Sequence, residues 1–268
     1  MRVISLNLNG IRSATNKGFF DWLEQQQADV VCVQELKAQA ASMSSQMLAP
    51  PGWQGYFHYA EKKGYSGVGI YSRQVAERVT DKIGHPIMDD EGRYLAIEIG
   101  DLTLVSLYLP SGSSGEERQA VKFDVMEAFQ GHLQDLRQSG REVLICGDWN
   151  IAHRQADLKN WRGNQKNSGF LPEERAWLGD LFDQQGWVDV YRGLHPDSTD
   201  TCYTWWSNRG QAWSNNVGWR IDYHIATPLL ASRAQCSEIY KQQRFSDHAP
   251  LIIDYDMRFG QNQGFSSE

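Results

Sequence analysis

The chain has 268 residues, of which 41% are hydrophobic and 22% are charged, and its formal net charge is −7. This length suits one large domain with an ample core, and the composition excludes a disordered chain. The acidic balance argues against indiscriminate nucleic-acid binding but leaves room for a local basic face.

Short apolar runs typical of buried strands recur along the chain. The first run starts at once, and Asn7 and Asn9 interrupt any signal-peptide core, so we expect a cytoplasmic protein. The sequence contains no stretch of 18 apolar residues, so we expect no membrane-spanning helix. The predicted strands lie near residues 2–6, 29–33, 67–71, 94–99, 102–108, 142–146, 219–225, 237–240 and 250–255.

Helical patterns separate some of these runs. Residues 17–27 and 116–136 carry apolar side chains at helical spacing, and Pro172 followed by two glutamates opens a third helix. Other runs are joined by short turns, such as Gly100-Asp101. This mixture predicts an α/β (α+β) fold with antiparallel hairpins and covering helices, not a simple doubly wound sheet.

No repeat, low-complexity tract or linker divides the chain. We therefore expect one domain over residues 1–258 and a polar, disordered tail over residues 259–268. No glycine-rich nucleotide-binding motif is present, and no CxxC pair, so the cysteines are expected to be reduced structural thiols. They are Cys32, Cys146, Cys202 and Cys236.

Several apolar runs end in polar side chains that a buried strand has no reason to carry. Such strand ends are where an α/β enzyme gathers its chemistry. Taken alone, each of these residues also has a structural explanation. Gly147-Asp148-Trp149-Asn150 could be a turn that ends a strand, and Tyr108 could be a buried tyrosine whose hydroxyl is hydrogen-bonded. Together they indicate a hydrolase assisted by a Mg²⁺-like ion, because hard oxygen ligands dominate. The set is Asn7, Asn9, Gln34, Glu35, Tyr108, Asp148, Asn150, Asp222, Asp247 and His248.

Three of these residues suggest roles from chemistry alone. His248 needs an acceptor that fixes its tautomer, and Asp222 is a candidate; such pairs serve as general acids or polarise a phosphate. Glu35 is a lone carboxylate after a buried run, which is costly unless it is paired or metal-bound.

Basic residues gather in or beside loop-like segments and leave room for a localised basic face despite the acidic total. They are Lys62, Lys63, Arg73, Lys159, Arg162, Lys166, Arg209 and Arg220.

A series of motifs spans nearly the whole chain. They are Asn7-x-Asn9-Gly10, Gln34-Glu35-x-Lys37, Gly64-Tyr65-Ser66-Gly67-Val68, Glu91-Gly92-Arg93, Tyr108, Gly147-Asp148-x-Asn150, Asn216-Val217-Gly218-Trp219-Arg220-Ile221-Asp222-Tyr223 and Ser246-Asp247-His248. In this order they resemble the exonuclease III family of abasic-site endonucleases, within the endonuclease/exonuclease/phosphatase superfamily.

The resemblance implies a four-layer α/β sandwich, in which helices flank two packed mixed sheets and the site lies at one edge. It implies Mg²⁺-dependent hydrolysis of the phosphodiester 5′ to abasic sites in duplex DNA, with Mn²⁺ as a substitute ion. The product would carry a 3′-hydroxyl, and 3′–5′ exonuclease and 3′-phosphodiesterase activities would be secondary. The enzyme is expected to be a monomer that needs no membrane.

The resemblance also implies a role for each site residue. Glu35 would bind Mg²⁺ with Asn9 and Asp247, although some relatives have Asp where Asn9 stands. Asp148 would orient or deprotonate the attacking water. The expected contacts to the water or the scissile phosphate come from Asn7, Tyr108, Asn150 and His248, with Asp222 orienting His248. The expected DNA contacts come from Arg73, Asn167, Trp205, Arg209, Trp219 and Ile221.

Two other functions fit the same superfamily. The first is an inositol-phosphate or lipid phosphatase, although segments 157–167 and 216–223 favour DNA. The second is a non-catalytic RNA-regulatory protein of the catabolite-repression-control type. Such regulators lose the site carboxylates, whereas Glu35, Asp148 and Asp222 all stand here. The sequence leaves open the number of metal ions, the general base and the balance of nuclease activities.

Overall fold

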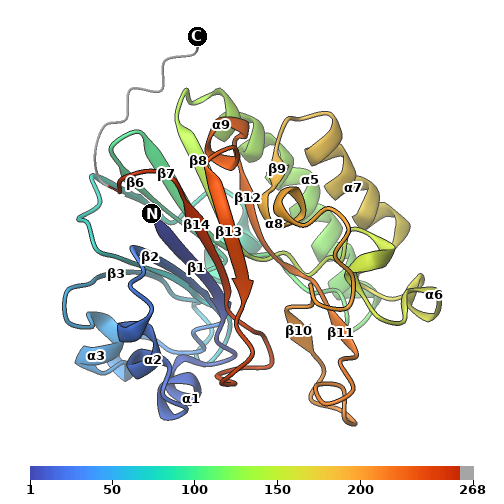
Figure 1. Ribbon diagram of the computed structural model, residues 1–268, viewed down its shortest axis with the longest axis horizontal. Coiled ribbons are helices and arrows are strands. Elements are labelled where there is room, and N and C mark those ends of the chain that lie inside the picture. The colour runs from blue at the N-terminus through green and yellow to red at the C-terminus, as the bar shows by residue number, and fades with distance from the viewer. Residues whose placement is uncertain (260–268) are drawn as a thin grey trace.

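Two six-stranded mixed sheets pack face to face in the computed structural model, which describes residues 1–259 (Figure 1). The first sheet has the order β13 (Ala234–Ile239), β14 (Leu251–Tyr255), β1 (Arg2–Asn7), β2 (Val30–Gln34), β4 (Val68–Ser72) and β3 (Gln54–His58). The second has the order β5 (Arg78–Thr80), β6 (Tyr94–Ile99), β7 (Leu102–Tyr108), β8 (Glu142–Asp148), β12 (Asp222–Ala226) and β9 (Val188–Asp189). A separate ribbon pairs β10 (Trp205–Trp206) with β11 (Gly218–Trp219).

Each sheet contains one parallel pair, β1 with β2 and β7 with β8. Parallel neighbours need a crossover, which α1 (Ile11–Asn16) and α2 (Phe19–Gln25) supply in the first sheet and α5 (Glu116–Gln138) in the second. The other helices are α3 (Ser45–Leu48), α4 (Pro86–Asp90), α6 (Trp161–Asn164), α7 (Pro172–Asp183), α8 (Val190–Leu194) and α9 (Pro228–Ala231), with 3₁₀ turns at Ala40–Ser42 and Gln155–Asp157.

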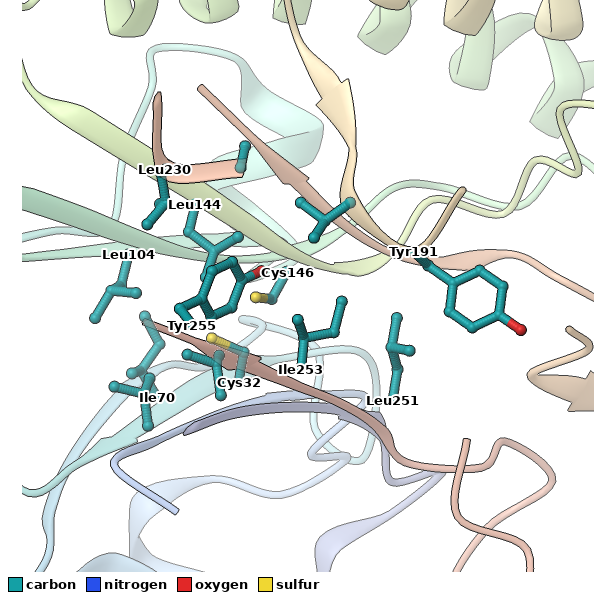
Figure 2. Close-up of a cluster of buried hydrophobic side chains, with 14 of the residues drawn as sticks. Cys32, Ile70, Leu104, Leu144, Cys146, Tyr191, Leu230, Leu251, Ile253 and Tyr255 are labelled. Atoms are coloured by element: carbon teal, nitrogen blue, oxygen red, sulfur yellow. The ribbon is translucent and has the colours of Figure 1, made fainter. Parts of the chain in front are cut away.

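The main core lies between the two sheets. In Figure 2, Cys32 and Ile253 of the first sheet face Leu104, Leu144 and Cys146 of the second. A second core fills the space between the first sheet and α1 and α2, and a third lies between the second sheet and α5 and α7. The predicted four-layer sandwich is therefore confirmed. Strands such as β2 are buried on both faces, which explains why they appear in the sequence as unbroken apolar runs.

Some predicted boundaries were wrong for physical reasons. The helix expected over residues 17–27 is present as the shorter α2, which begins only after Gly18, whose φ of 83° is left-handed; the preceding helix α1 was not predicted. The run at 219–225 divides into the ends of β11 and β12. Strands β3 and β5 were not predicted, because glycine, polar residues and partial exposure at a sheet edge weaken the apolar signal.

The cysteines and the chain end complete the comparison with the sequence. All four cysteines are free; three are buried and Cys236 is exposed. The tail expected over residues 259–268 lies, apart from Phe259, outside the described residues. None of the helices within residues 1–259 combines the length and the apolar character that crossing a bilayer requires.

Candidate active site

The polar strand ends of the two sheets meet at one edge of the sandwich. Asn7 ends β1, Tyr108 ends β7 and Asp148 ends β8. Asn9, Glu35 and Asn150 follow such ends, and all have positive φ values between 45° and 53°. Left-handed backbone is uncommon outside glycine and tends to mark functional turns. This edge of the sandwich is therefore the candidate active site.

Asn7 connects the two sheets. Its side-chain Nδ2 donates to Glu35 Oε1 at 2.8 Å and to Asp148 Oδ2 at 2.9 Å. Glu35 directly follows β2 of the first sheet and Asp148 ends β8 of the second, so one amide holds a carboxylate at the edge of each sheet. The buried amide of Asn7 thus fixes the spacing of two acids that the sequence placed 113 residues apart, from Glu35 to Asp148.

His248 faces two carboxylates of the second sheet, Asp222 and Asp148. Its Nδ1 lies 2.8 Å from Asp222 Oδ2, which also accepts a 2.6 Å hydrogen bond from Thr204 Oγ1. Its Nε2 lies 3.8 Å from Asp148 Oδ2. Burial opposes a charge on the imidazole, but the Asp222 carboxylate outweighs burial and raises the pKa of His248 to about 10. His248 is therefore an imidazolium with Nε2 turned toward the Asp148 carboxylate.

Asp148 has the opposite shift. Burial is the largest cause, and the nearby carboxylates of Asp222 and Glu35 add to it, so the pKa of Asp148 rises above its ordinary value in spite of His248. The backbone N–H of Asn150 donates to Asp148 Oδ1 at 2.9 Å and fixes the carboxyl plane. A buried carboxyl with a raised pKa is suited to exchanging a proton with water.

A second cluster contains the hard oxygen donors. Lys37 Nζ lies 2.7 Å from Glu35 Oε2 and donates to Asn9 Oδ1 at 2.5 Å, while Asn9 Nδ2 donates to Asp247 Oδ1 at 2.8 Å. Burial opposes ionisation of Glu35, but the Lys37 ammonium outweighs it and lowers the pKa of Glu35. The pKa of Asp247 is also lowered, against burial, by His248 and by hydrogen bonds from Asn9 and Trp205.

Two places in this edge have the donors for a divalent cation. In the first, the Lys37 ammonium already contacts oxygens of both Glu35 and Asn9, so a single cation reaches both. In the second, ligand atoms of Asp148, Asp222 and His248 lie within 4.8 Å of one another, and Asp222 Oδ1 is buried without a hydrogen-bond partner among the described residues. The charged imidazole makes the second place the poorer one for a cation.

Tyr108 is kept as a neutral phenol. Burial, followed by the Glu35 carboxylate, raises the pKa of its hydroxyl well above the ordinary value. The Arg93 guanidinium lies 4.5 Å from the ring centroid, and its Nη1 donates to the Tyr108 carbonyl at 3.1 Å. Glu91 accepts from Arg93 Nε at 2.6 Å and so fixes the guanidinium. The hydroxyl is therefore a positioned donor at the site.

A cleft of about 790 Å³ opens over these groups. One wall is apolar: Trp205 and Trp219 meet edge to face with ring centroids 6.3 Å apart, beside Ile221. The lining also includes the small residues from Ser111 to Ser113. The predicted site residues that line the cleft are Glu35, Tyr108, Asp148, Asn150, Asn167, Trp205, Arg209, Trp219, Ile221, Asp247 and His248.

Other predicted residues lie behind or away from the cleft. Asn7, Asn9 and Asp222 do not line it but bond to residues that do. Arg73 lies elsewhere: its guanidinium stacks 4.0 Å from the Trp53 ring centroid, in a separate hollow. Arg220, expected on the basic face, is instead fully buried.

Burial of Arg220 has a clear cause. Its guanidinium bonds to Asp157 Oδ1 at 2.8 Å and to Asp189 Oδ2 at 2.7 Å. Because Arg220 lies between Trp219 and Ile221 in the chain, this network anchors the apolar wall of the cleft.

Two residues of the site were missed by sequence reasoning. Lys37 stood in a quoted motif, but its contact with the acid two positions before it was not predicted. Thr204 gave no signal, because its partner Asp222 is brought to it only by the pairing of β10 with β11 and the fold around them.

Comparison with known proteins identifies similar chains. The family described as "Endonuclease/Exonuclease/phosphatase family" matches residues 4–248. An exodeoxyribonuclease of Bacillus subtilis is 36% identical over 254 residues, which are 94% of this chain and 98% of that protein. A DNA-(apurinic or apyrimidinic site) endonuclease of Dictyostelium discoideum is 33% identical over 96% of this chain and 71% of that protein.

Solved structures share the architecture. An AP endonuclease from Archaeoglobus fulgidus has a TM-score of 0.86 at 26% identity, covering 96% of this chain and 100% of that chain. A 3′-5′ exonuclease from Neisseria meningitidis has a TM-score of 0.86 at 24% identity, a likeness that concerns the fold alone.

Proposed function

Since this chain belongs to the endonuclease/exonuclease/phosphatase family and is a hydrolase of its exonuclease III and AP endonuclease type, we propose that its main substrate is duplex DNA with an abasic site. It cleaves the phosphodiester 5′ to the site and leaves a 3′-hydroxyl; 3′–5′ exonuclease and 3′-phosphodiesterase activities are secondary. The observation that carries the proposal is the cleft, in which a buried Asp148–His248–Asp222 group faces an apolar wall of Trp205 and Trp219.

In this mechanism Asp148 orients the attacking water and takes its proton. Its raised pKa reflects a carboxyl that holds a proton well, and the Asn7 and Asn150 hydrogen bonds aim it. Hydrolysis builds negative charge on the phosphate oxygens, and the His248 imidazolium and the Tyr108 phenol are the fixed donors that answer it. Asn150, which lines the cleft, supplies a further amide contact to the water or the scissile phosphate, whereas Asn7 acts through the Glu35 and Asp148 carboxylates that it bonds.

Glu35, Asn9 and Asp247 would hold a Mg²⁺ ion, with Mn²⁺ as a substitute. When bound, the ion supplies Lewis-acid stabilisation of phosphate charge. Carboxylate and amide oxygens are the ligands that this ion prefers, and the contacts of Lys37 support a cation at this place.

Substrate choice follows from the cleft walls. An abasic nucleotide has no base to stack, so turning it out of the duplex is cheap. The Trp205, Trp219 and Ile221 wall offers an apolar surface to a bare deoxyribose and no hydrogen bond to a base edge. Arg209, Lys166 and Asn167 at the rim would contact the flanking DNA backbone. We propose that the enzyme acts as a monomer in the cytoplasm.

A non-catalytic RNA-regulatory role is not favoured, because every carboxylate that hydrolysis requires is in place. The test is incision of a labelled duplex with one tetrahydrofuran abasic analogue, with and without Mg²⁺, beside the same duplex with an intact base. We expect Mg²⁺-dependent incision of the abasic duplex, with a 3′-end that a polymerase extends directly. Equal cleavage of both duplexes, or RNA binding without incision, would contradict the proposal.

A further inference from the structure

A buried ion pair lies behind the cleft. Lys122 Nζ on α5 is 2.6 Å from Glu174 Oε1 on α7, and both side chains have 0% exposed surface. Burying two charges costs free energy that their attraction does not fully return, and apolar residues of similar size often give equal stability. Stability alone is therefore a poor reason for this pair, and its other contacts matter.

Lys122 reaches the catalytic turn. Its Nζ also donates to the carbonyl of Asn150 at 2.8 Å. Asn150 has a left-handed φ of 53°, its N–H holds the Asp148 carboxyl and its side-chain Nδ2 donates to the Leu109 carbonyl at 2.8 Å. The ammonium thus holds the Asn150 carbonyl in the turn that orients the proposed general base.

Glu174 reaches the rim of the cleft. Its Oε2 accepts from the N–H of Gly169 at 2.7 Å and from the N–H of Leu171 at 3.0 Å. Both residues line the cleft, in the same loop as Asn167. The loop returns to the catalytic turn, because Gly169 accepts from the N–H of Ala152 at 2.8 Å.

We propose that Lys122 and Glu174 are positioning residues that hold the turn at 148–152 and the rim loop at 166–171 in one fixed relation. The ion pair is the connection: one partner bonds the turn and the other bonds the loop. The roles of the turn and the loop rest on the proposed function. Neither residue lines the cleft, so both act through Asn150 and through the 166–171 backbone.

The test compares Lys122→Met, Glu174→Met and the double variant carrying both changes. Each single variant leaves one buried charge unpaired and should be destabilised. The double variant has no such charge and should unfold at a higher temperature than either single variant. If the pair positions the site, kcat of the double variant on the abasic duplex should stay about 10- to 100-fold below that of the wild type, because small misplacements of catalytic groups have effects of this size.

Glu142→Gln is the matched control. Glu142 begins the same strand, β8, that ends in Asp148, and its Oε2 accepts from the N–H of Leu230 at 2.9 Å and from Thr227 Oγ1, far along the strand from the cleft. It should lose stability without a comparable loss of kcat. All assays are run well below the lowest melting temperature, and the Mg²⁺ concentration at half-maximal activity should be unchanged in every variant.

The proposal would be overturned if the double variant regained wild-type kcat together with its stability. It would also be overturned if kcat fell in proportion to melting temperature in every variant, Glu142→Gln included. A second measurement does not depend on activity. Hydrogen exchange of the free protein should become faster in peptides covering 148–152 and 166–171 in the double variant, but not in Glu142→Gln. Unchanged exchange there would also overturn it. If the wild type did not cut abasic DNA, this exchange result would still judge the network.

Discussion

Asp148 and Asp222 are direct cross-strand partners, at the end of β8 and the start of β12. Like charges opposite each other in a sheet repel, and both side chains are almost fully buried. His248 relieves this repulsion, because its two ring nitrogens face the two carboxylates, at 2.8 Å from Asp222 and 3.8 Å from Asp148. A change to any one of the three residues should therefore alter the electrostatic environment of the other two.

Asp148→Asn should reduce kcat by about 10²- to 10⁴-fold, the usual contribution of a general base. The melting temperature should fall little or not at all, because the change removes a buried carboxylate that faces Asp222. Single-turnover incision and thermal unfolding measure the two effects. A variant that kept more than a tenth of the wild-type kcat would assign the base to another group.

Asp222→Asn should lower the pKa of His248, because the carboxylate is what raises it against burial. Because the pKa of His248 is higher in the folded than in the unfolded protein, its protonation stabilises the folded state. This stabilisation is complete below the unfolded pKa of about 6.5 and is lost as the pH rises toward the folded pKa of about 10. The stability advantage of the wild type over Asp222→Asn should thus shrink between pH 6.5 and pH 10. Urea unfolding across this range and NMR titration of the His248 ring measure it. An advantage that does not vary with pH would argue for a neutral imidazole.

Glu35→Gln should weaken metal binding more than DNA binding. The change keeps the size of the side chain but removes the main hard, charged donor. We expect the Mg²⁺ midpoint to rise at least about 10-fold, since even outer-shell partners of a metal are worth that much. Binding of Mn²⁺, followed by electron paramagnetic resonance without DNA, gives a readout separate from activity. An unchanged midpoint would leave Glu35 with a structural role only.

Ser113→Trp should select against internal abasic sites. Ser113 lines the cleft, so a large ring there would obstruct a sugar turned out from continuous DNA more than a frayed 3′-end. Ser114→Trp is the matched control, since its neighbour but not Ser114 itself lines the cleft. The measurement is kcat/KM on an internal abasic duplex relative to a recessed 3′-end. Equal losses on both substrates would mean that this loop does not select.

Binding of abasic duplex should weaken with salt despite the acidic net charge. Lys166 and Arg209 line the cleft, and each phosphate contact contributes about 0.9 to the slope of log affinity against log salt. Lys166→Gln should therefore reduce the slope by roughly that amount, whereas Arg78→Gln on the edge strand β5 should not. Lys159 should matter less, since Asp200 already pairs with it at 2.9 Å. The slope is measured with Asp148→Asn and no metal, and a flat plot would rule out a basic DNA surface.

The sequence predicted most of this fold because its central strands are buried on both faces and leave strong apolar runs. It could not predict β3 and β5, whose edge positions need few apolar residues. The polar strand ends could be predicted for the same reason as the strands, because an Asp or Asn differs sharply from the apolar run that it ends. What remained hidden were partners set by tertiary contact, such as Thr204 for Asp222.

Basic residues were the least predictable part. Arg73 and Arg220 were expected on a basic surface. In the structure Arg73 stacks on Trp53, and Arg220 bonds two buried aspartates. Arginine bonds carboxylates and phosphates with the same planar fork, so its position in the chain does not say which it contacts. The three-dimensional arrangement alone separates these uses.

The edge that carries the candidate site is assembled from two sheets, and apolar packing together with the buried hydrogen bonds of Asn7 and Gln34 sets how far apart they stand. Side chains such as Leu104, Leu144 and Ile253, which no substrate reaches, therefore determine whether Asp148 and Glu35 face each other correctly. Substitutions in this inter-sheet core should therefore change activity as well as stability, although the residues lie outside the cleft.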